Sequence, residues 1–340
     1  MVSSPYSEPA EIEGEIFMIY RPGAGPPVET SDLRVLRQAL ADTGGLLWLD
    51  LHVCSEADGA ILADPFGFHP LTIEDSVADR MDAAKIDDHG EYMFIVVQAL
   101  QGYVEHEELQ AVEVDLYLGA NYVVSCHRAD LAAIEQFRDR CSRDDSLMAR
   151  GSDWLLHGIL DAIVDEYLPI VDAVDDTIDE LESRVLETPD QALLQQIMMV
   201  KRNSLRLRRA TAPQREIMSR LARGEFPRLI RPETSIYFRD IYDHLVHVEY
   251  LIEALRDIAD GALQTYLSVI SNRLNEVMKI LTVAFVPLTI GTLISGIYGM
   301  NLAEGFWPPS DSTWGFGAVV AAILAAGLLT LAYFRSRHWI

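Results

Sequence analysis

A row of polar and small side chains follows one side of a long helical stretch near the C-terminus. Steps of three and four residues connect its members, which are Gln264, Ser268, Ser271, Asn275, Met278, Thr282, Phe285, Thr289, Thr292, Gly296 and Gly299. Such steps keep side chains on one face of an α-helix. Hydroxyl and amide groups pack poorly in a dry coiled-coil seam, but they hydrogen-bond the water around a hydrated ion. The row therefore predicts several copies of this helix around a water-filled axis.

The row changes character along the helix. Met278, Leu281 and Phe285 interrupt it with a bulky apolar band, and Thr289 and Thr292 follow. An apolar band on a wet axis can exclude water, so these three residues are candidates for a hydrophobic gate. A polar stripe that merely faces solvent is the simpler alternative. That alternative does not explain why Thr289 and Thr292 continue the row inside an apolar segment.

Two apolar stretches, the first of which carries the upper part of the row, are long enough to cross a membrane. Residues 278–300 and 314–334 each span about twenty residues, and Lys279 at the start of the first is their only charged side chain. Helices of that length cross about 30 Å of hydrocarbon. We therefore expect two C-terminal transmembrane helices in contact with the lipid bilayer.

The charges beside the spans predict their orientation. Arg273 and Lys279 lie at the first span and Arg335 and Arg337 follow the second, whereas residues 301–313 contain no Lys or Arg. Basic residues favour the cytoplasmic side of a membrane. We expect a multi-pass protein of the cell (inner) membrane with cytoplasmic N- and C-termini.

The net charge of the chain limits the classes of molecule that it can bind. The chain has 340 residues and a formal net charge of −25, with 52 Asp and Glu against 27 Lys and Arg. Such a surface repels nucleic acid and concentrates cations. Three widely separated cysteines are typical of reduced thiols rather than of a disulfide framework or a zinc knuckle.

The chain divides into three parts. Residues 1–150 alternate strand-like and helix-like runs and predict a cytoplasmic α/β domain. Residues 151–277 predict a helical stalk, and residues 278–340 the transmembrane pore domain. The expected strands are 15–20, 46–51, 92–99, 109–118 and 121–127, and the expected short helices are 55–63, 70–78 and 131–143. The expected long helices are 153–187, 191–221 and 233–299.

The long helices carry opposite charges. Helix 153–187 is strongly acidic, with Asp172, Asp175 and Asp176 among its residues, and helix 191–221 is rich in arginine. Pairing of the two charged faces is the simpler expectation. The alternative is an acidic surface that attracts cations towards the membrane.

One chain has too few spans to enclose a pore, so a pore requires a closed ring of identical copies. Asn301 follows the first span and would give that ring a rim of carboxamide oxygens without fixed charge. Such a rim suits a cation that keeps its water. Mg²⁺ dehydrates reluctantly and is the first candidate.

Four motifs resemble the CorA family of divalent-cation channels. They are Ser295–Asn301 (SGIYGMN), Asn275–Lys279 (NEVMK), His69–Asp75 (HPLTIED) and Tyr237–His244 (YFRDIYDH). The likeness runs from about Trp48 to the C-terminus. It implies a funnel-shaped homopentameric channel, not an enzyme. The channel would carry hydrated Mg²⁺, and also Co²⁺ or Ni²⁺, down the membrane potential and would close when internal Mg²⁺ binds.

The resemblance and the row together assign roles. The selectivity residues would be Gly299, Met300 and Asn301. The pore-lining residues would be Asn275, Thr282, Thr289, Thr292 and Gly296. The gate would be Met278, Leu281 and Phe285. The resemblance further implies that Mg²⁺ acts as a regulatory ligand between subunits, bound by Glu74, Asp75, Asp161, Asp240 and His244.

Three features depart from the family pattern, and two alternatives remain open. Phe285 and Thr289 change the apolar profile of the pore. Gln264 stands where some members place a carboxylate. The loop after the signature lacks the Met-Pro-Glu sequence that often follows it, and Glu304 would be the acidic residue that collects cations instead. A zinc or cobalt transporter of the same fold, with or without proton coupling, is the nearer alternative. A membrane-anchored enzyme or sensor is the remote one. Residues 1–232 contain no Gly-x-Ser-x-Gly, His-Glu-x-x-His or phosphate-binding glycine loop that would favour it.

Overall fold

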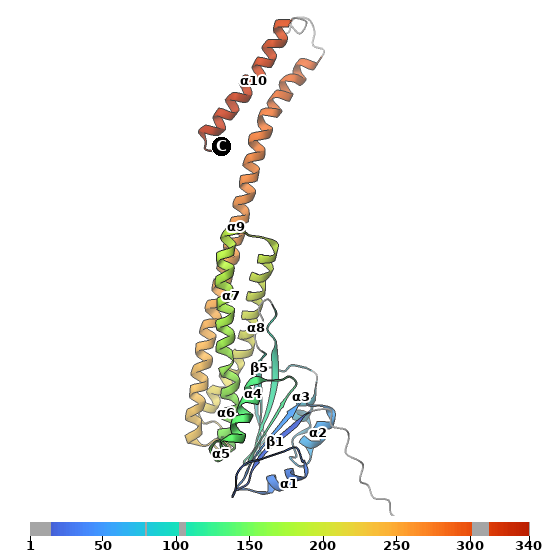
Figure 1. Ribbon diagram of the computed structural model, residues 1–340, viewed down its shortest axis with the longest axis vertical. Coiled ribbons are helices and arrows are strands. Elements are labelled where there is room, and N and C mark those ends of the chain that lie inside the picture. Colours follow the sequence, from blue (N-terminus) through green and yellow to red (C-terminus); the bar gives the residue numbers. More distant parts are fainter. Residues whose placement is uncertain (1–14, 79, 102–106, 301–312, 340) are drawn as a thin grey trace, which may run out of the picture. The chain divides into compact units, whose positions relative to one another are not determined.

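The computed structural model describes residues 15–78, 80–101, 107–300 and 313–339. It contains two compact units, one of residues 1–184 and 190–262 and the other of residues 185–189 and 263–340. Figure 1 labels their helices and strands. The division into three parts made from the sequence stays a prediction.

A seven-stranded mixed sheet forms the centre of the α/β region (Figure 1). Its order is β2-β1-β3-β7-β6-β5-β4. The strands are β1 (Ile16–Arg21), β2 (Val28–Thr30), β3 (Leu46–His52), β4 (Lys85–Asp88), β5 (Met93–Leu100), β6 (Ala111–Leu118) and β7 (Tyr122–His127). Only β3 and β7 pair in parallel among the described strands. The five expected strands are confirmed, and the short edge strands β2 and β4 are additional.

Short helices flank this sheet. They are α1 (Arg34–Ala41), α2 (Glu56–Ala63), α3 (Pro70–Val77), α4 (Ala132–Arg143) and α5 (Asp145–Met148). Helix α3 begins where a proline follows His69, whose Nδ1 accepts the Leu71 N–H at 3.2 Å. Proline fits the first helical position because its missing N–H would have no partner there. This cap fixes the helix that carries Glu74 and Asp75.

The first long helix is shorter than expected. Residues 153–187 form two helices, α6 (Ser152–Asp165) and α7 (Tyr167–Glu187), rather than one. Pro169 explains the break, because a proline ring clashes with the carbonyl four residues earlier, here that of Asp165. The next helix, α8 (Gln191–Ala222), begins as expected, with Asp190 Oδ1 accepting the Leu193 N–H at 2.7 Å.

Helix α9 (Pro232–Gly299) is continuous over 68 residues. Its lower part packs in the first unit through an apolar seam with steps of three and four. The buried residues of that seam are Phe238, Ile241, Leu245, Val248, Ile252, Leu255, Ala259 and Ala262. The polar row begins at Gln264, close to Tyr266, which is the last buried residue of the helix. One helix therefore changes from a core element to a helix with an uncovered polar face.

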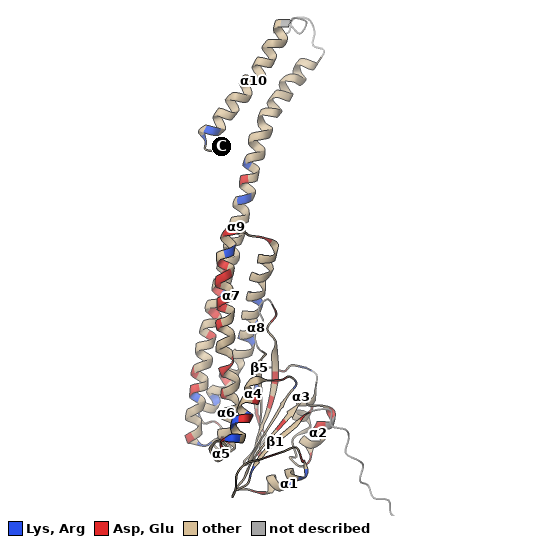
Figure 2. Ribbon diagram, viewed as in Figure 1, with Lys and Arg blue, Asp and Glu red and all other residues tan. Residues whose placement is uncertain are grey.

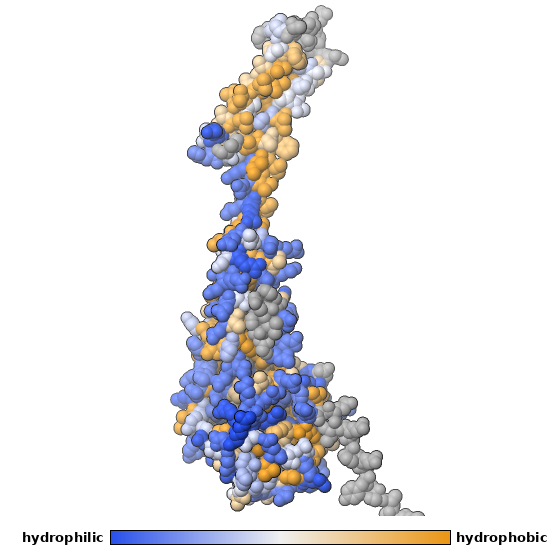
Figure 3. Space-filling view, viewed as in Figure 1, coloured by the Kyte–Doolittle hydropathy of each residue, from blue (hydrophilic) through white to orange (hydrophobic). Residues whose placement is uncertain are grey.

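Helix α10 (Thr313–Ser336) follows α9, and both are long and apolar enough to cross a membrane. Figure 3 shows hydrophobic residues over α10 and the distal part of α9. In the second unit α10 lies beside α9, and a Cβ added to Gly291 would come within 3.2 Å of Ile323. The two predicted spans are thus present as two adjacent helices.

Asp115 of β6 is a buried carboxylate without full hydrogen bonding. Its side chain is in the sheet core, and Oδ1 has no hydrogen-bond partner among the described residues. Burial, assisted by the nearby Glu113, raises the pKa of Asp115 to about 8. The folded protein therefore keeps a proton on this residue at pH values where the unfolded chain releases it.

We predict that Asp115→Asn stabilises the protein increasingly as the pH rises. A carboxyl group whose folded pKa is raised loses its favourable contribution between the unfolded pKa, near 4, and the folded one, about 8. The variant should match the wild type near pH 4 and exceed it by on the order of 5 kcal/mol at pH 8, because each unit of pKa difference corresponds to about 1.4 kcal/mol. Heat unfolding in detergent across this range measures the difference. Asp87→Asn, an exposed site on β4, is the control, and parallel pH profiles for Asp115→Asn and wild type would contradict the assignment.

Candidate functional site

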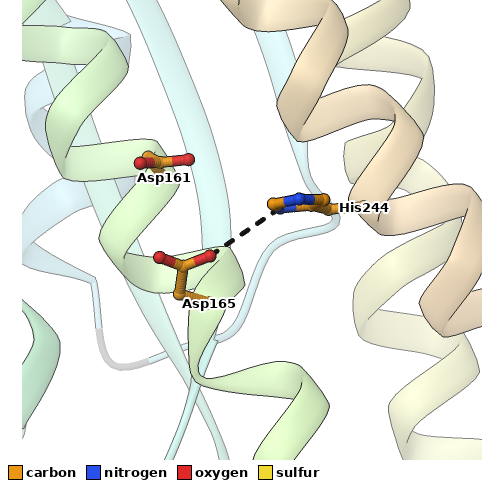
Figure 4. Close-up of side chains that lie close together, drawn as sticks. All are labelled: Asp161, Asp165 and His244. Atoms are coloured by element: carbon orange, nitrogen blue, oxygen red, sulfur yellow. Dashed lines mark ion pairs between the residues drawn. The ribbon is translucent and has the colours of Figure 1, made fainter.

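Two carboxylates and one imidazole meet between α6 and α9. Asp161 and Asp165 lie one turn apart on α6, and His244 faces them from α9 (Figure 4). One ligand atom from each residue lies within 4.8 Å of the others, and His244 Nδ1 is 3.7 Å from Asp165 Oδ1. In the part of the chain that the structure describes, this is the only such group of three. Oxygen and imidazole ligands at these distances suit a divalent cation.

The electrostatics of this cluster also favour a cation. Burial is the largest cause that raises the pKa of Asp161, and the carboxylates of Asp165 and Asp240 raise it further. The neighbouring His157 and His244 act in the opposite direction. A bound divalent cation would offset the repulsion among these carboxylates and favour their ionised forms.

The cluster contains two of the five predicted metal ligands. Asp161 and His244 come together, and Asp240 lies one turn before His244 on α9. Asp165 was missed, although its i,i+4 spacing from Asp161 could have suggested it. Glu74 and Asp75 lie on α3 and are not part of the group. A single chain does not bring all five predicted ligands together.

The polar row of α9 is uncovered in one chain. Phe285, Thr289 and Thr292 are exposed. Their face is opposite the one at Gly291 that lies against α10. The half-buried residues of the α10-facing side include Val283, Val286, Ile290 and Ile294. Four members of the row and four neighbouring apolar residues line an open groove of about 690 Å³; these eight residues are Phe285, Leu288, Thr289, Thr292, Leu293, Gly296, Ile297 and Met300.

The threonine hydroxyls of the row already donate hydrogen bonds to the backbone of their own helix. The hydroxyls of Thr282, Thr289 and Thr292 donate to the carbonyl oxygens four residues earlier, at 2.7, 2.9 and 2.9 Å. A hydroxyl that donates in this way still has lone pairs that accept hydrogen bonds. The outer surface of a hydrated cation presents water hydrogens. The threonine oxygens of the row can therefore accept hydrogen bonds from the water molecules around such a cation.

The other predicted pore residues lie on the same helix. Asn275, Met278 and Leu281 are exposed on α9 below the threonines, and Gly296 and Gly299 are exposed above them. Met300 follows the end of the helix and is also exposed. Asn301 and Glu304 lie outside the described residues.

The acidic face of α7 is not paired with the basic face of α8. Figure 2 shows acidic residues clustered along α7. Four of the α8 cations bind carboxylates elsewhere, in the pairs Lys201–Asp260, Arg202–Glu108, Arg206–Glu108 and Arg215–Glu249. No ion pair between α7 and α8 is present among the described residues, so the expectation of charge pairing is wrong. Apart from Glu180, which lies 3.9 Å from Arg184 of the same helix, the α7 carboxylates have no ion pair among the described residues and can attract cations.

Known proteins are similar to this chain in sequence and in fold. The family described as CorA-like Mg²⁺ transporter protein matches residues 43–336. The cobalt/magnesium transport protein CorA of Thermotoga maritima is 36% identical over 279 residues, covering 81% of this chain and 78% of that protein. The complete CorA magnesium transporter of Methanocaldococcus jannaschii has a TM-score of 0.79 and 20% identity, covering 95% of this chain and 98% of that one. The ZntB cytoplasmic domain of Vibrio parahaemolyticus has a TM-score of 0.57 and 11% identity, covering 75% of this chain and 99% of that one. These two structural likenesses establish a shared fold.

Proposed function

Since the chain belongs to the CorA-like Mg²⁺ transporter family, we propose that it is a channel for the passive uptake of hydrated Mg²⁺. Members of this family are membrane transporters rather than enzymes, which removes the alternative of a membrane-anchored enzyme. The observation that carries the proposal is the uncovered row on α9, with its threonine acceptors at membrane depth. The membrane potential would drive the cation inward.

The channel is a homo-oligomer, and five copies is the number that the family resemblance implies. Helix α10 covers only one side of α9 and leaves the polar row exposed. Polar groups facing hydrocarbon are costly, so the row should face a shared aqueous axis. Both termini are cytoplasmic, because the basic residues lie at the ends of the spans.

Selectivity arises from hydrogen-bond acceptors rather than from fixed charge. Gly299, Met300 and Asn301 form the outer entrance, and Asn275, Thr282, Thr289, Thr292 and Gly296 line the path below it. These groups bind the water shell of the ion, which is cheaper than removing it from Mg²⁺. Met278, Leu281 and Phe285 form the constriction that dewets when the path closes.

Internal Mg²⁺ closes the channel by binding between subunits. Glu74 and Asp75 of one copy face Asp161, Asp240 and His244 of the next, and the bound cation bridges them. Support comes from the Asp161–Asp165–His244 cluster, where carboxylates already converge. The cation shifts the equilibrium because it binds the closed ring better than the open one.

A flux experiment tests the transport proposal. Purified protein in liposomes, loaded with a fluorescent Mg²⁺ indicator, should take up Mg²⁺ when a K⁺ diffusion potential makes the interior negative. Uptake should persist without a pH gradient and stop when the potential is abolished. Uptake that requires a proton gradient would contradict a passive channel.

A transporter for zinc or cobalt, with or without proton coupling, is the second candidate. The imidazole of His244 favours it, because nitrogen ligands suit Co²⁺, Ni²⁺ and Zn²⁺ better than Mg²⁺. Competition among these ions in the same liposomes distinguishes the two. Zn²⁺ uptake that excess Mg²⁺ does not reduce would support the second candidate.

A further inference from the structure

Asp75, one of the proposed regulatory ligands, already holds two cations of its own chain. Arg80 donates to Asp75 Oδ1 at 2.6 Å, and the Lys85 ammonium donates to Oδ2 at 2.6 Å. Only 15% of the Asp75 side chain is exposed. Each of its oxygens, the atoms through which it would bind a divalent cation, therefore already accepts a hydrogen bond from a basic side chain.

The two cations are held in place by their surroundings. Lys85 is the first residue of β4, and its Nζ lies 5.5 Å from the centre of the Phe94 ring. Asp82 Oδ2 is 3.6 Å from the same Nζ, and Asp82 Oδ1 is 3.3 Å from Arg80 Nε. Asp75, Asp82, Arg80 and Lys85 thus form one group of two acidic and two basic side chains.

Acidic residues also lie behind this group. Glu113 accepts the backbone N–H of Asp82, and Asp115 is buried on the same strand. Removing one basic side chain would leave carboxylates in excess at this edge of the sheet. Such an excess is what attracts a divalent cation.

We propose that Lys85 and Arg80 compete with the regulatory divalent cation for Asp75 and thereby set the internal Mg²⁺ concentration at which the channel closes. This inference rests on the proposed function. The ammonium and guanidinium groups occupy the lone pairs that the cation would use, and their charges repel it. The apparent affinity for the cation equals the intrinsic affinity multiplied by the fraction of protein in which Asp75 is free of Lys85 and Arg80, so a smaller free fraction weakens binding.

Neutral replacements should make the channel close at lower internal Mg²⁺. Lys85→Met keeps the length of the side chain and removes its charge, and it should lower the half-inhibiting Mg²⁺ concentration about tenfold. Arg80→Gln should also lower the half-inhibiting Mg²⁺ concentration, but by less, because the Arg80 side chain is 54% exposed and that of Lys85 is 35% exposed. Inhibition is measured as Mg²⁺ current in liposome patches with internal Mg²⁺ varied.

Two control variants separate this effect from a general change of charge. Lys85→Arg keeps a cation beside Asp75 and should stay close to the wild type. Arg37→Gln breaks a pair of similar length with Asp64, 2.7 Å, away from Asp75, and should change nothing. Heat unfolding shows whether each variant is folded, and Arg80→Gln decides the question if Lys85→Met does not fold.

Different results would contradict the competition at Asp75 and the proposed regulation by Mg²⁺. An unchanged or higher half-inhibiting concentration in a folded, conducting Lys85→Met or Arg80→Gln channel would overturn the inference alone. A wild-type channel that internal Mg²⁺ never closes would overturn the proposed regulation, and with it the inference.

Discussion

Asn301→Ala is expected to lower potential-driven Mg²⁺ uptake by about a hundredfold or more, since several hydrogen bonds of about 1 kcal/mol each are lost around one ring. Every copy would lose its carboxamide at the same level of the path. The entering ion would then meet methyl groups where acceptors for its water are required. Indicator-loaded liposomes under a fixed potential measure the initial rate.

A control in the same loop isolates the carboxamide. Ser312→Ala also removes a polar group between the two spans and should retain most of the uptake. The assembly and insertion of both variants are checked by size-exclusion chromatography in detergent. Uptake at the wild-type rate by a correctly assembled Asn301→Ala protein would remove Asn301 from the selective entrance.

Removing Asp75 and Asp240 together should leave channels that stay open at high internal Mg²⁺. The double variant Asp75→Asn, Asp240→Asn takes a carboxylate from each side of the proposed intersubunit site. We expect the half-inhibiting Mg²⁺ concentration to rise by at least about tenfold, because charged ligands provide most of the attraction for a divalent cation. Patch recordings with internal Mg²⁺ varied provide the measurement.

The matched control removes the same charge from other places. Asp64 and Asp257 are also carboxylates that each pair with an arginine, Arg37 and Arg256, and their double asparagine variant should close like the wild type. A half-inhibiting concentration that stays at the wild-type value in the Asp75→Asn, Asp240→Asn variant would refute the proposed ligands. An equal rise in both double variants would also refute them, because it would indicate a general effect of charge.

Periodic features of the chain were predictable from the sequence. The two spans, the continuous α9 and the five longer strands follow from hydropathy and from the spacing of apolar residues. The row on α9 was predictable for the same reason, since its members repeat at the helical period. The side of α9 that α10 covers was not predictable from the sequence, because it depends on how the two helices pack at Gly291.

Features that depend on contacts between distant residues were missed. Strands β2 and β4 are short and polar, and only pairing with β1 and β5 makes them strands. The carboxylates of α7 and the arginines of α8 suggested pairing, yet the α8 cations bind partners elsewhere in the fold. The partners of Asp75 were missed because the pairing with Lys85 depends on the approach of α3 to β4.

The central claim is that the polar row of α9 faces an aqueous axis, and the reactivity of an introduced thiol tests it most directly. The native cysteines are buried, so Mg²⁺ uptake by the wild type should resist a charged thiol reagent. Thr292→Cys should be blocked by that reagent, whereas Leu329→Cys, on the exposed side of α10, should not react. Uptake by Thr292→Cys that the reagent leaves intact, while uptake by Leu329→Cys is blocked, would place the row against lipid and contradict the account.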